Sequence, residues 1–435
     1  MIVSKFGGSS VADSKQFKKV KNIVKSDARR HVVITSAMGK RTGDDYKVTD
    51  LLYLTHAHLQ YSVSCTHVFN IIKDRFLQLE KDLELDINIE KEFDSLFEEL
   101  DKNISIDYLV SRGEYLTAKL LASYLGYTFV DAKDIIKFNY DFSINYEATD
   151  TLIQAMMQKY KNIVVPGFYG SMGDGTVRVM KRGGSDITGS IIARSLKAIA
   201  YENWTDVSGI LMANPQIVAS PKEIDVITYD ELRELSYMGA NVIHEDAIYP
   251  VKDLNIPIYI KNTNKPEFKG TKIVDKVVGG LNDHIITGVS GKTNFTTITV
   301  YRHNASSEVG LLKKALEVFE KYDVSVENVF NSIDNFSIVV DSKVVEKCVY
   351  EIISDLRSKL NANSIKVDND LALVAVVGRN LANHIGASGS IFKTLGENNI
   401  NIKMISQGSD EINIILGVNT SDFEKTIRVI YDVFS

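Results

Sequence analysis

The sequence predicts an α/β domain with a largely parallel sheet, followed by a duplicated ferredoxin-like βαββαβ module. Three observations predict this arrangement. The chain has 435 residues, a length typical of about three domains. Short β-branched runs alternate with helical stretches over roughly the first 280 residues, as in parallel α/β folds. The last 140 residues or so instead show the order strand, helix, strand, strand, helix twice.

The elements of the first domain, expected over residues 1–280, follow from these patterns. Six β-branched runs are expected to be strands: Ile2–Phe6, His31–Ser36, Thr128–Asp131, Asn162–Pro166, Ala198–Trp204 and Ile256–Asn262. Helical periodicity marks Ser111–Leu125 and Tyr229–Leu235. Residues 48–101 contain no strand-like run and are rich in leucine and paired charges, which predicts a packed helical insertion. The glycine-rich GFYGSMGDG from Gly167 predicts a β-hairpin with Asp174-Gly175 as its turn.

The C-terminal part repeats itself without a gap. VGLLKKALEVFEKYDVSVENV, from Val309, aligns with IGASGSIFKTLGENNINIKMI, from Ile385. Gly310 then matches Gly386, an offset of 386 − 310 = 76 residues. Such self-similarity indicates two copies of one supersecondary unit, expected at residues 281–370 and 371–435, with the domain boundary in the glycine-rich stretch 279–291.

Composition and charge exclude several classes of protein. The net charge is −6, with acids and bases interspersed, whereas nucleic-acid binding requires a basic face. No run of 18 apolar residues is present, so no membrane-spanning helix is expected. The N-terminus lacks the pattern of a signal peptide. Cys65 and Cys348 stand without CxxC or Cys/His spacing, which favours a reduced, cytoplasmic protein without structural zinc.

The opening stretch KFGGSSV, from Lys5, is typical of phosphate binding. A strand that ends in two glycines before a helix starting near Ser10 exposes backbone N–H groups to an anion. Glycine lets the backbone approach a phosphate closely, and Lys5 supplies a point charge. A tight strand–helix turn with an exposed lysine explains the same residues equally well.

A second glycine pair, in KRGGSDITG from Lys181, opens another helix. Two such turns facing each other could hold a triphosphate and an anionic acceptor. Arg182 suits a carboxylate, because its planar guanidinium pairs with two oxygens. Asp186 suits Mg²⁺ or a role in orienting Arg182, although a helix N-terminal acid stabilised by the dipole is a serious alternative.

An ordered set of motifs then resembles the aspartate kinase family over almost the whole chain. The motifs are KFGGSSV, TSAMGK with KVTDLL, SRGE, KRGGSD, WTDVSGI and ELSYMGANVIHEDAIYPVKDLNIPIYIKNT. The tail VAVVG…IFKTLGENNINIKMISQGSDEINI resembles the ACT regulatory domains of that family. The resemblance implies an amino-acid kinase fold, a three-layer αβα domain with a mainly parallel sheet, followed by two ACT domains. It also implies that the strand near Ile285–Ser290 joins the second ACT unit.

The resemblance implies an enzyme that transfers the γ-phosphoryl group of ATP, bound with Mg²⁺, to the β-carboxylate of L-aspartate, giving 4-phospho-L-aspartate. This is the first step towards lysine, threonine and methionine. Mg²⁺ is expected to be held mainly through ATP. The implied catalytic residues are Lys5, Arg182 and Asp186. The implied substrate-binding residues are Ser36, Thr49, Glu114 and Arg182, with Glu114 taking the ammonium group. The implied nucleotide-binding residues are Lys5, Gly7, Gly8, Ser9, Thr205 and Asp206.

The chain departs from the family pattern on the nucleotide side. Leu211, Gln216 and Asn241 stand where the family often has a tyrosine, a basic residue and a lysine. These departures support one alternative, a non-catalytic amino-acid sensor with a decayed kinase domain. A separate alternative is a kinase for another small carboxylate or related substrate (glutamate, carbamate or a nucleotide), against which Glu114 in SRGE and the ACT pair argue. The retention of Lys5, Arg182 and Asp186 argues against a decayed site and favours the aspartate kinase.

For the tail, the resemblance implies feedback control by lysine, threonine or both. ACT domains pair side by side and bind amino acids, so a homodimer or homotetramer is expected. No nucleic-acid or membrane partner is expected. The loop NASSEVG precedes a helix and suits an effector carboxylate. The candidate effector residues are Asn304, Ser307, Glu308 and Glu327.

Overall fold

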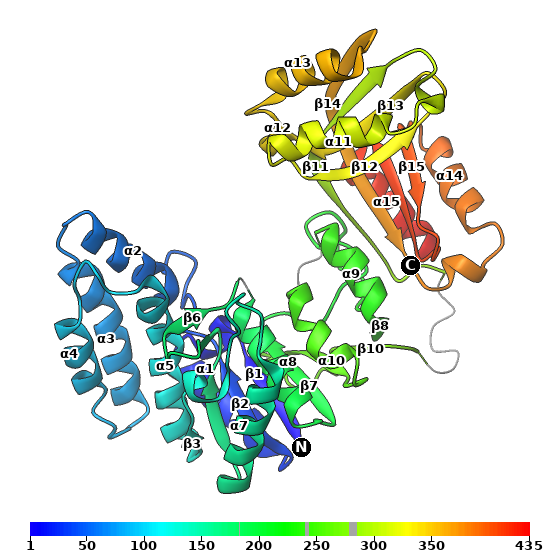
Figure 1. Ribbon diagram of the computed structural model, residues 1–435. Coiled ribbons are helices and arrows are strands. Elements are labelled where there is room, and N and C mark those ends of the chain that lie inside the picture. The colour runs from blue at the N-terminus through cyan, green and yellow to red at the C-terminus, as the bar shows by residue number, and fades with distance from the viewer. Residues whose placement is uncertain (182, 240–242, 278–284) are drawn as a thin grey trace. The chain divides into compact units, whose positions relative to one another are not determined.

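The computed structural model describes residues 1–181, 183–239, 243–277 and 285–435, which divide into two compact units (Figure 1). The first unit comprises Met1–Ile210, Glu223–Arg233 and Asn241–Leu281. The second comprises Leu211–Lys222, Glu234–Ala240 and Asn282–Ser435. Within the described residues, no helix combines the length and the apolar character needed to cross a bilayer.

The first unit is built on an eight-stranded sheet in the order β3-β4-β2-β1-β7-β9-β10-β8. Neighbouring strands run parallel except β9 and β10, which are antiparallel. The strands are β1 (Ile2–Phe6), β2 (Arg30–Thr35), β3 (Thr128–Phe129), β4 (Ile163–Pro166), β7 (Ala200–Thr205), β8 (Val226–Thr228), β9 (Ile258–Asn262) and β10 (Thr271–Val274). The six predicted strands and the largely parallel sheet are therefore confirmed.

The predicted strand at residues 128–131 is shorter than expected. β3 ends at Phe129, because Asp131 turns the chain into the short helix α6 (Ala132–Ile135). The Asp131 carboxylate accepts a hydrogen bond from the Lys133 N–H at 3.1 Å, which makes it an N-cap.

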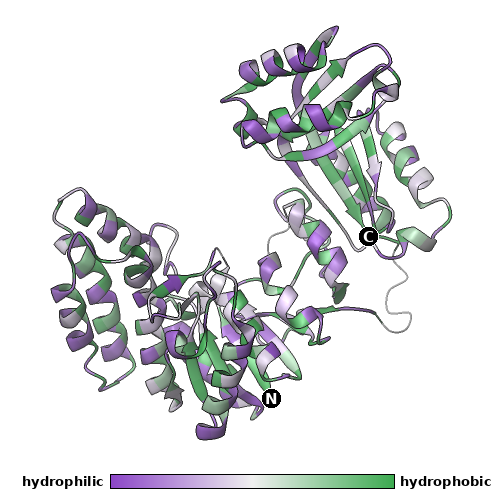
Figure 2. Cartoon of the chain, viewed as in Figure 1, coloured by the Kyte–Doolittle hydropathy of each residue, from purple (hydrophilic) through white to green (hydrophobic). Residues whose placement is uncertain are grey.

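Helices cover both faces of this sheet, as a three-layer fold requires. Side chains alternate along a strand, so Phe6 faces the apolar core beneath α1 (Ser14–Ser26) and α5 (Ile106–Leu125). Lys5 consequently points to the opposite face, where α8 (Gly184–Ser195) packs beside α7 (Tyr146–Lys159). Figure 2 shows the same division, with apolar residues concentrated on the strands and polar residues on the outer helix faces.

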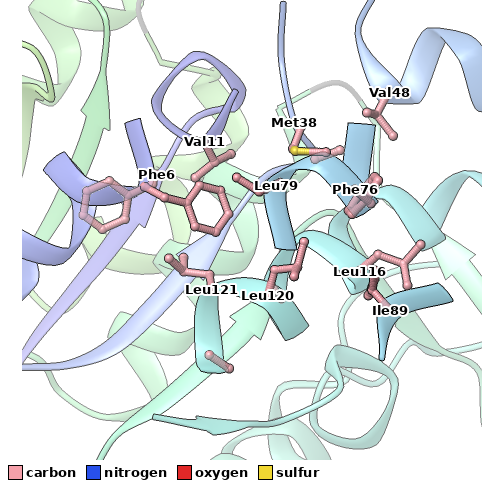
Figure 3. Packing of buried hydrophobic residues seen from close by; sticks show 14 of the residues in the cluster. Phe6, Val11, Met38, Val48, Phe76, Leu79, Ile89, Leu116, Leu120 and Leu121 are labelled. Carbon is pink, nitrogen blue, oxygen red and sulfur yellow. The ribbon is translucent and has the colours of Figure 1, made fainter. Parts of the chain in front are cut away.

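The predicted helical insertion is confirmed. It consists of α2 (Val48–Gln60), α3 (Thr66–Asp82) and α4 (Ile89–Glu98). Its apolar side chains share one core with the sheet domain, in which Phe76 and Leu79 of α3 lie in the same cluster as Met38 and Val48 (Figure 3). The insertion is thus an integral part of the first unit.

The remaining elements of this region are short. The predicted hairpin is confirmed as β5 (Tyr169–Ser171) and β6 (Val177–Val179), with Gly175 in the turn at φ +87°. The helical run predicted from Tyr229 is α9 (Tyr229–Tyr237), whose residues 229–233 are grouped with the first unit and 234–237 with the second. A 3₁₀ turn, η2 (Glu245–Ala247), and α10 (Tyr249–Lys252) follow it.

The second unit contains a six-stranded antiparallel sheet in the order β12-β13-β11-β14-β16-β15. Its strands are β11 (Gly288–Tyr301), β12 (Val326–Asn331), β13 (Asn335–Asp341), β14 (Ser364–Val377), β15 (Met404–Gln407) and β16 (Asn413–Val418). Its helices are α11 (Leu311–Lys321), α12 (Ser342–Val345), α13 (Val349–Leu360), α14 (Ala387–Glu397) and α15 (Phe423–Phe434), with the 3₁₀ turns η3 (Ala305–Ser307), η4 (Leu381–Asn383) and η5 (Thr420–Asp422).

The internal repeat is visible in this unit. Helix α11 starts at Leu311 and α14 at Ala387, an offset of 387 − 311 = 76 residues, as the sequence predicts. Each helix follows a left-handed glycine, Gly310 at φ +82° and Gly386 at φ +89°. The long strand β11 pairs through Gly288–Lys292 with β14 and through Phe295–Tyr301 with both β13 and β14. It therefore links the two halves of the sheet.

Residues 211–222 follow β7 along the chain but are grouped with the second unit. Within that unit, the Val289 N–H donates to the Met212 carbonyl at 2.7 Å. The Lys222 N–H donates to the Tyr431 hydroxyl at 3.0 Å, and Arg428 donates to a main-chain carbonyl of the same segment at 2.8 Å. The predicted boundaries of the two repeated modules, residues 281–370 and 371–435, remain a prediction. The two compact units are distinguished by how residues pack, and this does not show where one repeat ends and the next begins.

Candidate active site

A cavity of about 1120 Å³ lies in the first unit, beyond the carboxyl ends of β1, β2 and β7. This is where ligands bind in open α/β sheets. All described residues that were predicted to serve catalysis, substrate or nucleotide line it: Lys5, Gly7, Gly8, Ser9, Ser36, Thr49, Glu114, Asp186, Thr205 and Asp206. Arg182 lies outside the described residues. The structure therefore brings together residues separated by as many as 201 positions (206 − 5).

The phosphate-type loop after β1 differs in one respect from the expectation. The helix predicted near Ser10 begins only at Ser14, where the Asp13 carboxylate caps α1 by accepting from the Gln16 N–H at 2.9 Å. The predicted start near Ser10 falls instead in a 3₁₀ turn, η1 (Gly8–Val11), which precedes α1. The Gly7 N–H is already bonded to the Trp204 carbonyl at 2.9 Å. Lys5 and the turn, not an α-helix N-terminus, thus form this side of the cavity.

Two glycines allow this turn to pack against the loop that follows β2. The Gly39 N–H donates to the Gly8 carbonyl at 2.9 Å. A Cβ at Gly39 would lie 2.6 Å from the Gly8 carbonyl carbon, and one at Gly8 would lie 2.9 Å from the Ala37 oxygen. Both neighbours are backbone atoms, so neither position can accept a side chain without moving a wall of the cavity.

An ion pair between Lys5 and Asp186 lines the cavity. The Lys5 Nζ is 2.6 Å from the Asp186 Oδ1, and both side chains are largely buried. Asn203 links the pair: its Nδ2 donates to Asp186 at 3.0 Å, and its Oδ1 accepts from Lys5 at 3.4 Å. The sequence predicts that Asp186 holds Mg²⁺ or orients Arg182. The partners of its side chain within the described residues are Lys5 and Asn203.

Sequence reasoning missed Asn203, although its strand carries a signal. A buried parallel strand normally consists of apolar residues, yet β7 places Glu202 and Asn203 side by side in a buried run. Glu202 points to the other face, where it accepts from Ser4 at 3.0 Å and pairs with Arg30 at 2.8 Å. Asn203 points to the α8 face, together with Lys5.

The N-terminal half of α8 packs closely against two neighbouring side chains and accepts a hydrogen bond from one of them. Gly183 precedes the helix at φ +77°, and a Cβ there would lie 2.3 Å from the His244 Cβ. The Tyr201 hydroxyl donates to the Asp186 carbonyl at 3.1 Å. A Cβ at Gly189 would lie 2.6 Å from the Tyr201 ring. The predicted glycine-led helix start is therefore confirmed, and its close packing fixes Asp186 against the sheet.

Glu114 of α5 is a buried carboxylate at the cavity wall. Only 4% of the residue is exposed, and its Oε2 has no hydrogen-bond partner among the described residues. Burial raises the pKa of Glu114 to about 8, against the opposing effect of the Ala37 N–H. An unpaired, buried carboxylate oxygen is costly unless a ligand completes it. A cationic group such as an ammonium fits this position.

Additional charged residues surround the mouth of the cavity. Lys40, Lys47 and Lys181 add positive charge, while Thr49 and Asp50 come from the first turn of α2. The three lysines belong to motifs that are visible in the sequence, but no role was predicted for their side chains. These lysines suit a polyphosphate together with an anionic acceptor, in a cavity that four acids, Asp50, Glu114, Asp186 and Asp206, also line.

On the nucleotide side, Thr205 and Asp206 lie at the end of β7, where the Thr205 hydroxyl donates to Asp206 at 3.1 Å. Asn262 donates to the Asp206 carbonyl at 3.2 Å and so steadies this corner. Leu211 and Gln216 are grouped with the second unit, and Asn241 lies outside the described residues.

The candidate effector residues lie in the second unit. Asn304 adopts φ +57° before η3, and its carbonyl accepts from the Ser307 hydroxyl at 2.9 Å. Glu308 pairs with Arg302 and with Lys314, which donates to it at 3.1 Å and lowers the pKa of the Glu308 carboxyl. Glu327 accepts a hydrogen bond from Tyr237. Both acids are thus engaged within the unit.

Comparison with known proteins gives two domain matches. The model of the amino acid kinase family matches residues 1–262, and that of an ACT domain matches residues 374–434. Among curated proteins, aspartokinase 3 of Bacillus subtilis is 35% identical over 451 aligned residues, covering 100% of this chain and 98% of its own.

Solved structures agree with this assignment. The aspartate kinase of Clostridium acetobutylicum superposes with a TM-score of 0.95 at 46% identity, covering both chains completely. Aspartokinase III of Escherichia coli, solved with aspartate and ADP, has a TM-score of 0.78 at 25% identity and covers 99% of each chain. The chain therefore belongs to the aspartate kinases of the amino acid kinase family, the ATP-dependent enzymes that phosphorylate L-aspartate.

Proposed function

We propose that the cavity of the first unit carries out this transfer with the residues that line it. Lys5, Gly7, Gly8 and Ser9 bind the phosphates of ATP, and Thr205 and Asp206 contact the nucleotide. Ser36, Thr49 and Glu114 bind the amino-acid acceptor. Arg182 pairs with the acceptor carboxylate. The observation that supports this proposal is that all of these residues except Arg182, which lies outside the described residues, line one cavity.

The chemistry requires positioning more than proton transfer. An aspartate carboxyl has a pKa of about 3.9, so the acceptor is already an anion near neutral pH. The obstacle is repulsion between the carboxylate and the γ-phosphate, together with the need for in-line geometry. Lys5 reduces the repulsion with its fixed charge. Asp186 and Asn203 hold Lys5 before the substrates bind.

Glu114 determines which acceptors bind. Its unpaired Oε2 suits the α-ammonium of aspartate, because a buried ion pair satisfies both groups. A dicarboxylate without an ammonium, such as succinate, leaves Glu114 unpaired and binds poorly. The side chain thus selects an amino acid over an otherwise similar anion.

Mg²⁺ is expected to accompany ATP. Mg²⁺ is usually held by one or two carboxylates together with substrate phosphates, and Asp186 and Asp206 line the cavity beside the phosphate-type loop. When bound, the ion neutralises charge on the phosphates. These residues therefore fit a magnesium ion held mainly through the nucleotide.

We further propose feedback control by lysine, threonine or both through the second unit, with Asn304, Ser307, Glu308 and Glu327 at the effector site. The E. coli enzyme has been solved with lysine and aspartate, and the curated E. coli relative is described as lysine-sensitive. The Clostridium enzyme is described as allosteric. Pairing of ACT units between chains predicts a homodimer or homotetramer. We propose that the protein acts in the cytoplasm. There it would catalyse the first step towards lysine, threonine and methionine.

The experiment is a panel of acceptors. ADP release is measured with MgATP and L-aspartate, L-glutamate, succinate or no acceptor, each with and without lysine and threonine. We expect turnover with aspartate, little with glutamate or succinate, and inhibition by at least one of the two effectors. A folded protein that binds amino acids without acceptor-dependent ADP release would indicate a sensor instead.

A further inference from the structure

Arg75 of α3 is a buried charge that none of the roles above uses. Only 3% of its side chain is exposed. Its Nη1 donates to the Tyr46 carbonyl at 2.7 Å, and its Nη2 donates to the Gly39 carbonyl at 2.7 Å. The Asp45 carboxylate is 3.7 Å from Nη2, and Nε has no hydrogen-bond partner among the described residues.

The two carbonyls that Arg75 bonds stand near the two ends of one loop, residues 39–47. The Val48 N–H donates to the Met38 carbonyl at 3.1 Å, so the chain is also closed directly behind this loop. Within the loop, Arg41 donates to Asp45 at 2.8 Å. The guanidinium thus fastens both ends of a loop that is otherwise largely exposed.

This loop forms part of the cavity wall. Gly39, Lys40 and Lys47 line the cavity, and α2, which begins at Val48, adds Thr49 directly after it. The Gly39 N–H also bonds the Gly8 carbonyl of the phosphate-type loop at 2.9 Å. A displacement of Gly39 would therefore move residues on both sides of the cavity: Thr49 on the acceptor side and Gly8 on the phosphate side.

We propose that Arg75 is a positioning residue for phosphoryl transfer, which holds loop 39–47 and, through Gly39, the turn at Gly8 in the geometry that the reaction needs. A buried charge that serves only stability has little advantage, since well-packed apolar residues often replace buried ions without loss. A planar guanidinium can bond two carbonyls in fixed directions, which an apolar side chain or a lysine cannot do. The helical insertion thereby contributes to the active site without touching a substrate.

The test compares Arg75→Met with a matched variant of the same helix. Methionine keeps much of the arginine stem but bonds neither carbonyl. Leu79→Ala removes buried apolar contact from α3, one helical turn further on, and the apolar Leu79 side chain can form no hydrogen bond to the loop carbonyls. This inference rests on the proposed function, because it takes the cavity as the catalytic site. The turnover of the wild-type protein with MgATP and aspartate is therefore measured first.

We expect Arg75→Met to lower kcat/KM by about 10–100-fold, because small displacements of reacting groups have effects of this size. Leu79→Ala should lower the midpoint of thermal unfolding and leave kcat/KM near the wild-type value. Hydrogen exchange followed by mass spectrometry should show faster exchange at residues 39–47 in Arg75→Met and not in Leu79→Ala. Arg75→Lys, which keeps the charge but not the fork, should fall between wild type and Arg75→Met.

Two outcomes overturn the inference. One is unchanged kcat/KM in Arg75→Met when the wild type is active. The other is equal loss of kcat/KM in Arg75→Met and Leu79→Ala, which would indicate a general effect on stability. If Arg75→Met does not fold, the comparison is made with Arg75→Lys. An inactive wild-type protein would contradict the proposed function, and the exchange experiment would still test whether Arg75 holds the loop.

Discussion

Lys5 carries the central charge of the proposed transfer. We expect Lys5→Ala to lower kcat by about 10²–10³-fold, or about 2.7–4 kcal/mol, the typical effect of losing one preorganised donor to the transition state. Lys18→Ala, on the exposed face of α1, is the matched control and should have wild-type turnover. Steady-state ADP release measures both variants. Near-normal turnover of Lys5→Ala would remove Lys5 from the mechanism.

Glu114 gives a prediction that depends on pH. Its pKa is raised to about 8 by burial, whereas an ammonium binds the ionised form. The KM for aspartate should therefore fall as pH rises from about 6 to about 8, by up to tenfold per unit. Glu114→Gln should raise this KM roughly 10–100-fold, as expected for a lost hydrogen bond to a charged group, and remove the pH dependence. A rise in the KM for ATP alone would show that the assignment is wrong.

The same residue affects the stability of the substrate-free protein. Because the folded pKa of Glu114 lies above its unfolded value, its contribution to the free energy of unfolding is fully present below about pH 4.5. That contribution is lost as pH rises through about 8. The difference in unfolding free energy between wild type and Glu114→Gln should follow this course in chemical denaturation. A difference that does not vary with pH would contradict the raised pKa.

Asn203 is expected to be a positioning residue. Asn203→Leu keeps the branched shape of the side chain but removes its hydrogen bonds to Lys5 and Asp186. We therefore expect about a tenfold fall in kcat, with little change in either KM. Asn203→Asp places a second carboxylate beside Asp186, which should introduce a new ionisation into the pH profile of kcat. Thr149→Val, which removes a buried acceptor on α7 outside the cavity, is the control. Equal effects in Asn203→Leu and Thr149→Val would argue for a purely structural role.

At the residue scale, the sequence predicted which residues line the cavity, because its motifs lie at the ends of strands. Lys5 and Asp206 could be predicted in this way. Asn203 and Arg75 could not, since their importance lies in contacts with residues distant in sequence. The Asn203–Lys5 bond joins residues 198 positions apart, and no local pattern encodes it.

At the scale of elements, the start of α8 is tightly constrained by its packing. Gly183→Ala should cost about 1–2 kcal/mol for the left-handed backbone alone, and its Cβ would also meet the His244 Cβ at 2.3 Å. We expect a lower unfolding midpoint and a lower kcat/KM, measured by thermal melting and steady-state kinetics. His244→Ala cannot relieve the clash, because alanine keeps the Cβ.

Gly126→Ala is the matched control for this prediction. Gly126 ends α5 at φ +67°, and a Cβ added there would meet no neighbouring atom within 4 Å. The substitution should lower stability through backbone strain while leaving kcat/KM unchanged. If the two glycine variants behave alike, the packing of Gly183 against His244 has no catalytic consequence.

Strand and helix order could be predicted because the hydrophobic patterns are strong, whereas element ends depend on capping. α1 begins at Ser14 and not near Ser10 because Asp13 provides the cap. β3 is short because Asp131 caps α6. Both aspartates are visible in the sequence. Whether either side chain caps a helix depends on the conformation of the backbone around it, which the sequence pattern alone does not give.

At the scale of the whole molecule, the repeat predicted the second unit, because matching residues 76 positions apart adopt matching structures. The grouping of residues 211–222 with that unit could not be predicted. The bonds that hold the segment, from Val289 to Met212 and from Lys222 to Tyr431, join it to distant parts of the chain.

Effector control is tested in the full-length protein. We expect lysine or threonine to inhibit turnover, and Glu308→Ala to shift the inhibition curve to higher effector concentration by about tenfold, as for a lost charge-assisted contact. Glu320→Ala, an exposed acid on α11, should leave the curve in place. Inhibition that is identical in Glu308→Ala and wild type would place the effector elsewhere.

The central claim is that this protein forms an acyl phosphate on the side chain of aspartate. The most direct measurement is hydroxylamine trapping, with MgATP and L-aspartate, followed by mass spectrometry of the hydroxamate and parallel measurement of ADP. We predict aspartate β-hydroxamate in proportion to the ADP released. ADP release without this hydroxamate, or no ADP release from folded protein, would contradict the claim.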